Sequence, residues 1–238
     1  MLTARPTGTL TMPRPSVSKA CGWAAGAALV CAVLAPAVAA ERPAATFESV
    51  FQSGREPAAL FYRVTFAGVD GEHTLQVWRD RQVRLRRKTD DALDTYVVRN
   101  AADPLEYRMT VVDYRKRITT QIDRNNLIRL GHFSDWFDLA HGLRHPIGAY
   151  RLAPTSAPAG APAPASTCRW YVLSQGDSTH RICWSAREHL PMVIWSDAKT
   201  SAVWRVTQVE HGPIADEVFV LHDAGFVRND ANADIDGD

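Results

Sequence analysis

Short runs of apolar and β-branched residues that alternate with polar residues fill most of the chain after residue 59. Turn-forming pairs such as Asp70-Gly71 and Asp90-Asp91 separate many of them, and connections this short join antiparallel strands. We therefore predict a mainly β fold with some α (α+β), with about 10–11 strands in a single large curved antiparallel sheet or half-open β-barrel. The predicted strands cover residues 60–66, 73–79, 82–88, 95–100, 105–113, 117–122, 170–173, 179–184, 192–196, 202–209 and 217–220.

Two segments have helical rather than strand periodicity. Residues 46–52 place Phe47, Val50 and Phe51 at helical spacing, with Gly54 just past the end. The second segment, near residues 135–141, has Ser134 as a good N-cap and Gly142 at the position where a left-handed residue ends a helix. Its apolar residues cover more than half of its circumference, so we expect it to be buried on the concave face of the sheet.

Cys168 and Cys183 lie on two predicted strands that flank the turn sequence Gln175-Gly176-Asp177-Ser178. If the turn is centred between Gln175 and Gly176, the two cysteines are directly opposite each other, close enough for a disulfide. The alternative is a metal site with two thiolates, to which His180 could contribute. We predict the disulfide, because a pair of cysteines in an exported chain is usually oxidised.

Residues 1–40 have the three-part pattern of a secretory signal peptide: a basic start, an apolar run from Trp23 to Val38, and small residues up to Ala40. The alternative is an uncleaved N-terminal anchor, but the apolar run is short for a span of the bilayer. We predict cleavage before Glu41 and a periplasmic or secreted protein with no membrane-spanning segment after cleavage.

Composition and charge limit the organisation of the remaining chain. Three of the 27 basic residues and none of the 26 acidic residues precede Glu41, so cleavage changes the net charge from +1 to −2. Such a balance gives no overall attraction to nucleic acid or to a membrane.

We predict one domain over residues 41–228, with a Pro/Ala-rich loop at 153–167 that could alternatively mark a domain boundary. Residues 229–238 resemble the start of a calcium loop but lack its glycine and its closing glutamate, which favours a disordered acidic tail.

The order of these elements resembles the bacterial lipoprotein-carrier superfamily (LolA/LolB-like proteins and the RseB-type sensors). The resemblance covers residues 44–228 and includes Cys183-Trp184 and the strand start Leu190-Pro191-Met192-Val193-Ile194. It implies a half-open barrel of about eleven strands, lidded by helices, that holds acyl chains or other hydrophobic ligands in an apolar cavity.

On this basis we expect eight apolar side chains to form the wall and the lid of the cavity. On strands 73–79 and 82–88, alternation points the apolar residues one way and Arg84 and Arg86 the other. The predicted ligand-binding residues are Phe61, Val64, Leu75, Val77, Val83, Leu85, Trp136 and Phe137.

Two other groups of residues, a possible metal-binding set and a cluster of arginines, are explained by ordinary structural roles. Asp138, His141 and His145 could bind a divalent metal, but Gly142 should end the helix before His145, so we expect a capped helix and no metal or cofactor. The arginines around strands 73–88 could bind an anionic lipid head group or glycan; nearby aspartates favour a neutralised, solvated face.

The motifs of serine hydrolases, zinc proteases and phosphate-binding loops are absent from the sequence. We therefore expect a non-catalytic protein that binds or carries a hydrophobic ligand or lipid. Two alternatives remain open: an envelope scaffold or sensor that binds a protein partner through the sheet edge, and an enzyme with an unrecognised polar site.

Overall fold

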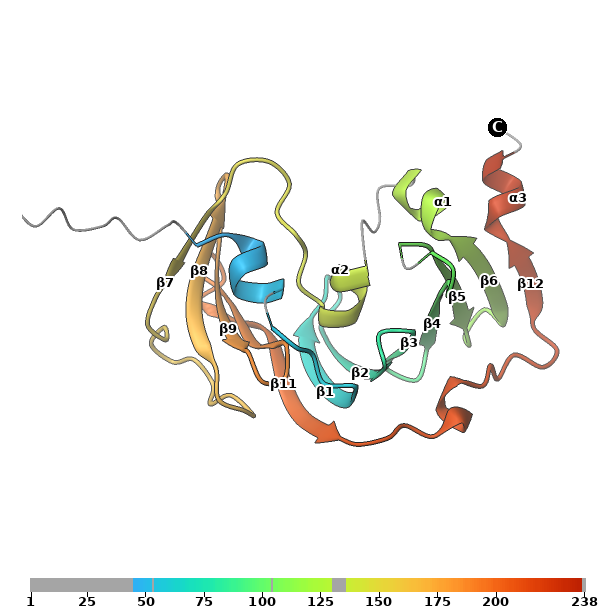
Figure 1. Cartoon of the computed structure of the whole chain (residues 1–238), viewed down its shortest axis with the longest axis horizontal. Helices are drawn as coiled ribbons and strands as arrows, with labels where there is room; N and C mark the ends of the chain where they lie inside the picture. Colours follow the sequence, from blue (N-terminus) through green and yellow to red (C-terminus); the bar gives the residue numbers. More distant parts are fainter. Residues whose placement is uncertain (1–44, 53, 104, 130–135, 237–238) are drawn as a thin grey trace, which may run out of the picture. The chain divides into compact units, whose positions relative to one another are not determined.

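The computed structural model describes residues 45–236 except 53, 104 and 130–135, so the predicted signal peptide and the N-cap Ser134 lie outside the described residues. Residues 42–238 form one compact unit. Twelve strands make one sheet in the order β12-β6-β5-β4-β3-β2-β1-β11-β10-β9-β8-β7 (Figure 1). The predicted mainly β class is confirmed. The sheet is open, because its edge strands β12 and β7 do not pair with each other.

The strand bounds follow the predicted runs closely over most of the chain. The strands are β1 (Ala59–Ala67), β2 (Glu72–Asp80), β3 (Arg84–Thr89), β4 (Leu93–Arg99), β5 (Tyr107–Asp113), β6 (Ile118–Asp123), β7 (Arg151–Pro154), β8 (Arg169–Gln175), β9 (Ser178–Ser185), β10 (Leu190–Ser196), β11 (Ser201–His211) and β12 (Val227–Asp230).

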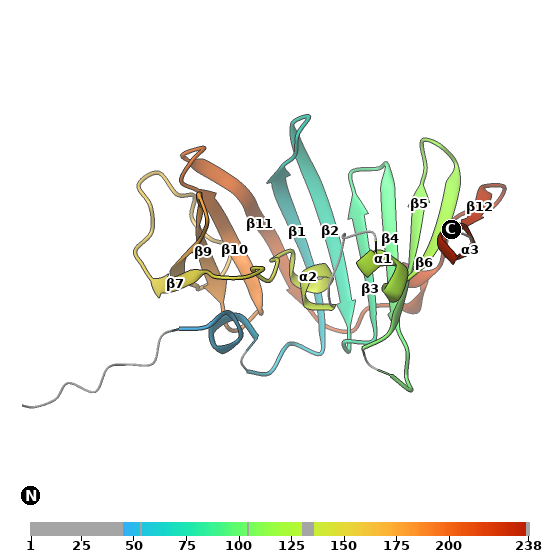
Figure 2. The same ribbon diagram turned by 90° about the horizontal axis from the view of Figure 1, so that it is seen from above.

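Two antiparallel meanders, β1–β6 and β7–β11, meet where β1 pairs with β11 (Figure 2). This pairing matches Leu60 with His211 at one end and Phe66 with Trp204 at the other. Strands from both sides of the Pro/Ala-rich segment therefore belong to the same sheet. That segment contributes its first two residues to β7 and then has no further strand or helix until β8.

The disulfide between Cys168 and Cys183 is present, with the two Cα atoms 5.3 Å apart. The predicted hairpin register was wrong. The turn is Gly176-Asp177, with Gln175 paired to Ser178, so Trp170 rather than Cys168 is opposite Cys183. Gly176 has a φ of +54°, a conformation that a two-residue hairpin turn requires and that glycine adopts without strain.

The helical segments are all short. They are the π-helix η1 (Glu48–Gln52), α1 (Arg124–Arg129), α2 (Trp136–His141), the 3₁₀-helix η2 (Asp216–Phe219) and α3 (Ala231–Asp236). η1 and α2 fall where helical periodicity predicts them. Residues 217–220, which the sequence predicts as a strand, mostly belong to η2 instead.

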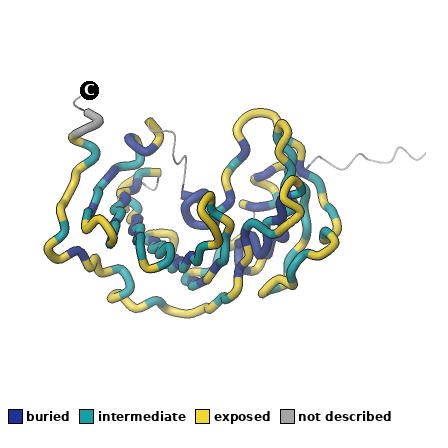
Figure 3. The backbone as a smooth tube through the Cα atoms, turned by 180° about the vertical axis from the view of Figure 1, so that it is seen from behind, coloured by how far each residue is buried: buried dark blue, intermediate teal, exposed yellow. Residues whose placement is uncertain are grey.

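One face of the sheet carries the main apolar core. Leu85, Val97, Met109 and Ile122 are successive cross-strand partners on β3 to β6. They share one buried cluster with Leu60, Tyr62, Val64, Leu75 and Val77, and with Trp136, Leu139 and Ala140 of α2. We call this side of the sheet the helix face. Figure 3 shows the buried stretches along α2 and the strands beside it.

A second buried cluster joins η1 to the other end of the sheet. Phe47 packs with Phe51 and Phe137, and Phe51 packs with Trp184, at ring-centroid distances from 4.9 to 5.7 Å. Leu143, Leu152 and Ile182 complete this cluster. Phe137 therefore points away from the cluster that contains Trp136.

The segment between β11 and β12 runs along the opposite face of the sheet and is mostly exposed (Figure 3). The Arg86 guanidinium donates to the Val218 carbonyl at 2.8 Å, and the Arg84 guanidinium lies 4.2 Å from the centre of the Phe219 ring. These contacts explain why η2 does not join the sheet: its backbone is held by side chains of β3 rather than by a neighbouring strand.

The C-terminal residues were predicted as a disordered tail, and the structure corrects this for residues 229–236. β12 pairs with β6 in parallel, so the sheet is mixed rather than wholly antiparallel. α3 follows β12 directly, and the Asn232 side chain accepts a hydrogen bond from the Asp123 backbone N–H at 2.8 Å. Backbone pairing rather than apolar burial holds this edge, since all four residues of β12 are exposed.

Candidate ligand-binding site

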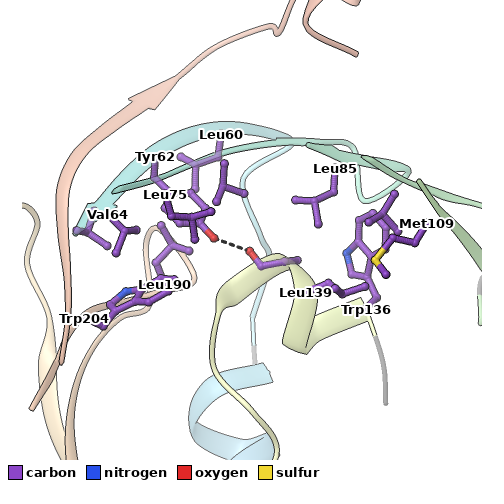
Figure 4. Close-up of a cluster of buried hydrophobic side chains, with 14 of the residues drawn as sticks. Leu60, Tyr62, Val64, Leu75, Leu85, Met109, Trp136, Leu139, Leu190 and Trp204 are labelled. Atoms are coloured by element: carbon purple, nitrogen blue, oxygen red, sulfur yellow. Dashed lines mark hydrogen bonds between the residues drawn. The ribbon is translucent and has the colours of Figure 1, made fainter. Parts of the chain in front are cut away.

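The helix α2 is fixed to the helix face by apolar and by polar contacts (Figure 4). Trp136, Leu139 and Ala140 are at most 7% exposed, and they pack in the same cluster as the strand residues beneath them. Complete burial of a large apolar side chain such as that of Leu139 contributes roughly 1.5–3 kcal/mol.

The carbonyl groups at the C-terminal end of a helix have no partner within the helix, and here the sheet supplies partners. The Tyr62 hydroxyl donates to the Ala140 carbonyl at 2.9 Å, which is the dashed line in Figure 4. The Arg87 guanidinium reaches the Leu139 carbonyl at 3.4 Å. Side chains of β1 and β3 therefore anchor the end of α2, so α2 is held at both its apolar face and its C-terminus.

Gly142 ends α2 in the left-handed conformation that the sequence predicts, with φ at +67°. Its backbone N–H donates to the Asp138 carbonyl at 3.1 Å. A Cβ atom at this position would be 2.3 Å from Cη2 of Trp204. The indole of Trp204, which donates from Nε1 to the Pro191 carbonyl at 2.9 Å, therefore lies directly against the helix end.

A pocket of about 370 Å³ opens beside this contact. Four apolar side chains that line it come from residues that face each other on successive strands of the sheet. Phe66 is opposite Trp204, Trp204 is opposite Ile194, and Ile194 is opposite Ile182. Directly opposite residues share one face of a sheet, so these four side chains form a continuous apolar row across β1, β11, β10 and β9. The remaining apolar lining comes from Ala67, Leu143, Leu173 and Val203.

Polar groups of the pocket come from the β8–β9 hairpin and the segment after α2. Arg144, Gln175, Ser178 and His180 line it. Oγ of Ser178 is 3.2 Å from Nδ1 of His180, and the Gln175 amide donates to the Ile147 carbonyl. The pocket thus combines an apolar floor with a polar rim, as small-molecule sites usually do.

A second pocket, of about 280 Å³, is lined by residues from both ends of α2 and is more polar. Glu56 and His141 line it, with Oε1 of Glu56 3.2 Å from Nε2 of His141. Burial alone would raise the pKa of Glu56, but the hydrogen bond and charge of His141, with the charges of Arg79 and His189, lower it to about 2. Burial lowers the pKa of His141, against the opposing effect of Glu56.

This ionisable cluster has a structural role. Arg79, 4% exposed, donates to the backbone carbonyls of Glu188 and His189 at 3.0 and 3.4 Å. It therefore holds the β9–β10 turn against β2. Among the residues that the structure describes, no three His, Cys, Asp or Glu side chains come together so that they could hold a metal ion. The Asp138 carboxylate does meet His145, but it accepts from the His145 backbone N–H at 3.1 Å, while Nε2 of the His145 ring contacts Glu48 at 2.6 Å.

The eight predicted cavity residues divide into three groups, and none of them lines the 370 Å³ pocket. Five are core: Val64, Leu75, Val77, Leu85 and Trp136 lie in the main buried cluster. Phe137 belongs to the second cluster and, with Trp136, lines the smaller pocket.

Phe61 and Val83 do not share the helix face. Phe61 alternates with Leu60 and Tyr62 and so points to the opposite face, where its ring is 5.2 Å from that of Trp78. Val83 is 50% exposed because it lies in the turn between β2 and β3, where strand alternation does not apply.

The residues that do line the apolar pocket come mainly from β8 to β11. One of them, Ile194, lies in the strongly apolar run Leu190–Ser196, every residue of which is buried or half-buried. Such a run predicts burial on both faces, but it does not show which residues border a cavity.

The basic strands are largely neutralised by aspartates. Arg84 pairs with Asp80 at 2.7 Å, and Lys88 pairs with Asp91 at 2.8 Å. The Arg86 guanidinium contacts the fully buried Asp94 at 2.6 Å.

Neither the known protein-family models nor the curated proteins match this chain. Within the described part of the chain, no helix has the length and apolar character needed to cross a bilayer.

Proposed function

We propose that this protein is exported to the cell envelope and there binds a hydrophobic ligand, a lipid or an acyl chain, without catalysing a reaction. The observation that carries the proposal is the apolar row of Phe66, Trp204, Ile194 and Ile182 under a pocket of about 370 Å³. That volume is within the range of about 300–1,000 Å³ that is typical of small-molecule sites.

In this proposal the sheet acts as a half-open barrel, with the helix face as its concave side and α2 as a plug in its middle. The anchoring of α2 by Tyr62 and Arg87 supports a fixed plug rather than a mobile lid. The ligand would then occupy the space between the plug and β8–β11. This arrangement agrees with the resemblance to the lipoprotein carriers, in which a curved sheet encloses an apolar cavity.

Export is part of the same proposal and rests on the pattern of residues 1–40. The disulfide between Cys168 and Cys183 is compatible with an oxidising compartment. N-terminal sequencing of the protein from the periplasm should give a chain that begins near Glu41, and a chain that still begins at Met1 would contradict cleavage.

Ligand binding is tested with an apolar fluorescent probe and with acyl chains that displace it from the folded protein. Leu173→Glu, which puts a charged side chain into the apolar pocket wall, should weaken probe binding at least tenfold, since the carboxylate must lose water when an apolar probe lies against it. Val69→Glu is the matched control, because Val69 is fully exposed in the β1–β2 turn.

Circular dichroism and thermal unfolding should show that both variants remain folded at the temperature of the assay. Failure of every apolar probe to bind the wild-type protein would refute the proposal, as would equal binding by the two variants. Native mass spectrometry of protein from the periplasm, followed by lipid extraction, would identify the natural ligand.

A further inference from the structure

The polar rim of the 370 Å³ pocket carries positive charge and hydrogen-bond donors but no carboxylate. Arg144 is exposed, and within the described residues no ion pair or hydrogen bond involves its guanidinium. This contrasts with Arg84 and Arg86 on the other side of the sheet, which are each paired to an aspartate at 2.6–2.7 Å. Arg144 is therefore a cation at a pocket mouth that can take an anionic partner from solution.

His180 adds a second donor at the same rim. Its Nδ1 atom is 3.2 Å from the Ser178 hydroxyl. When that hydroxyl donates to Nδ1, the neutral imidazole carries its proton on Nε2 and offers it as a donor. The Gln175 amide donates one N–H to the Ile147 carbonyl, which leaves its second N–H as a further donor at the rim. Asp177, the acidic residue of the hairpin turn, is exposed and does not line the pocket.

The apolar row and the donor rim together specify an amphiphile. We propose that the ligand is a single-chain amphiphile with an anionic oxygen head group, whose chain lies along Phe66, Trp204, Ile194 and Ile182 and whose head group binds Arg144 and His180. The proposal rests on the hydrophobic-ligand function above and adds the class of head group. A carboxylate and a phosphate monoester share the required chemistry, because each presents anionic oxygens that a guanidinium can bind with two parallel hydrogen bonds.

The experiment compares compounds with the same chain and different head groups, the two anions below their critical micelle concentrations and the alcohol below its solubility limit. Dodecanoate, dodecyl phosphate and dodecanol are titrated at pH 7.5 into the wild-type protein that carries a displaceable apolar probe. We expect the two anions to bind at least tenfold more tightly than the alcohol, as is typical of a hydrogen bond to a charged group. The ratio between the two anions then shows which head group the rim prefers.

Two arginine variants locate the effect. Arg144→Gln should bring the anion-to-alcohol ratio to within about twofold of one and leave the affinity for dodecanol unchanged. Arg151→Gln is the matched control: Arg151 is exposed on β7 and is not part of the pocket lining, so its loss should leave the ratio as in the wild type.

The outcomes separate this proposal from the function it rests on. If none of the three compounds binds, the hydrophobic-ligand function fails and this proposal fails with it. If the alcohol binds as tightly as the anions, the apolar pocket stands and the head-group proposal is overturned. If Arg151→Gln reduces the ratio as much as Arg144→Gln does, the preference reflects surface charge in general, which also overturns the proposed site.

Discussion

The contact between Gly142 and Trp204 gives the sharpest test of how α2 is held. Gly142→Ala places a methyl group on a backbone with φ at +67°, 2.3 Å from Cη2 and 2.9 Å from Cζ2 of the Trp204 indole. Trp204 is 8% exposed and its Nε1 atom is bonded to the Pro191 carbonyl, so the ring has little freedom to move away.

Two costs add in this variant. The left-handed backbone conformation costs a residue with a Cβ about 1–2 kcal/mol, and overpacking of a buried contact costs about 1–3 kcal/mol. We therefore expect Gly142→Ala to lower the free energy of unfolding by about 2–5 kcal/mol.

Gly148→Ala separates the two costs. Gly148 also has a positive φ, +82°, but a Cβ there would have nothing within 4 Å. This variant should lose only the backbone part, about 1–2 kcal/mol. Urea unfolding followed by circular dichroism measures both, at equal m-values. Equal losses for the two variants would refute the close packing of α2 against Trp204.

A double-mutant cycle with Trp204→Phe provides an independent check. The smaller ring lacks the atoms nearest to the new methyl group, so Gly142→Ala should cost at least 1 kcal/mol less in the Phe background, a typical coupling between residues in contact. Additive effects would show that the cost arises from the backbone alone.

Three further predictions concern stability. Trp136→Ala should cost roughly 3–5 kcal/mol in urea unfolding, because the side chain is 7% exposed in the main core; a loss below about 1 kcal/mol would show that α2 does not pack there. Oxidised, denatured protein that begins near Glu41, and therefore lacks Cys21 and Cys31, should contain no free thiol, and replacement of Cys168 and Cys183 by serine should cost about 3 kcal/mol for a loop of 15 residues; two reactive thiols in that protein would contradict the bridge. The pKa of Glu56 is lowered from 4.5 to about 2, so its contribution, at most about 3 kcal/mol, is present above pH 4.5 and is lost as the pH falls towards 2. Glu56→Gln should therefore flatten the stability profile over that range, and parallel profiles for the variant and the wild type would refute this assignment.

The sequence predicts strands well where one face is buried. On β2, Leu75 and Val77 are buried and Gln76 between them is not, which is the period-2 pattern that a half-covered strand requires. β12 carries no such signal, because Val227 and its three polar neighbours are all exposed and backbone pairing alone holds them. Local propensity misleads at Val218 and Val220, whose carbonyls accept hydrogen bonds from Arg86 and Tyr96 on the face of the sheet.

The candidate site was harder to predict than the fold. Phe61 and Val64 are three residues apart on one regular strand, so they cannot point to the same face, and strand parity alone could have excluded one of them. The pocket itself depends on long-range register. Phe66 meets Trp204 only because β1 pairs with β11, and no local pattern specifies that pairing.

The pairing of β1 with β11 also has a consequence for the order in which the protein folds. Hairpins within β1–β6 and within β8–β11 close short loops, whereas the hydrogen bond from the Thr207 hydroxyl to the Arg63 carbonyl joins residues 144 positions apart. Loop-closure entropy makes such distant contacts slow to form, so the seam between the two meanders should close last. Pulse-labelling hydrogen exchange would detect this as late protection of β1 and β11, and simultaneous protection of all strands would contradict it. A chain whose halves join only after residue 211 has emerged lacks its central seam until then, and under the proposed export such a chain can still be threaded through a narrow translocation channel.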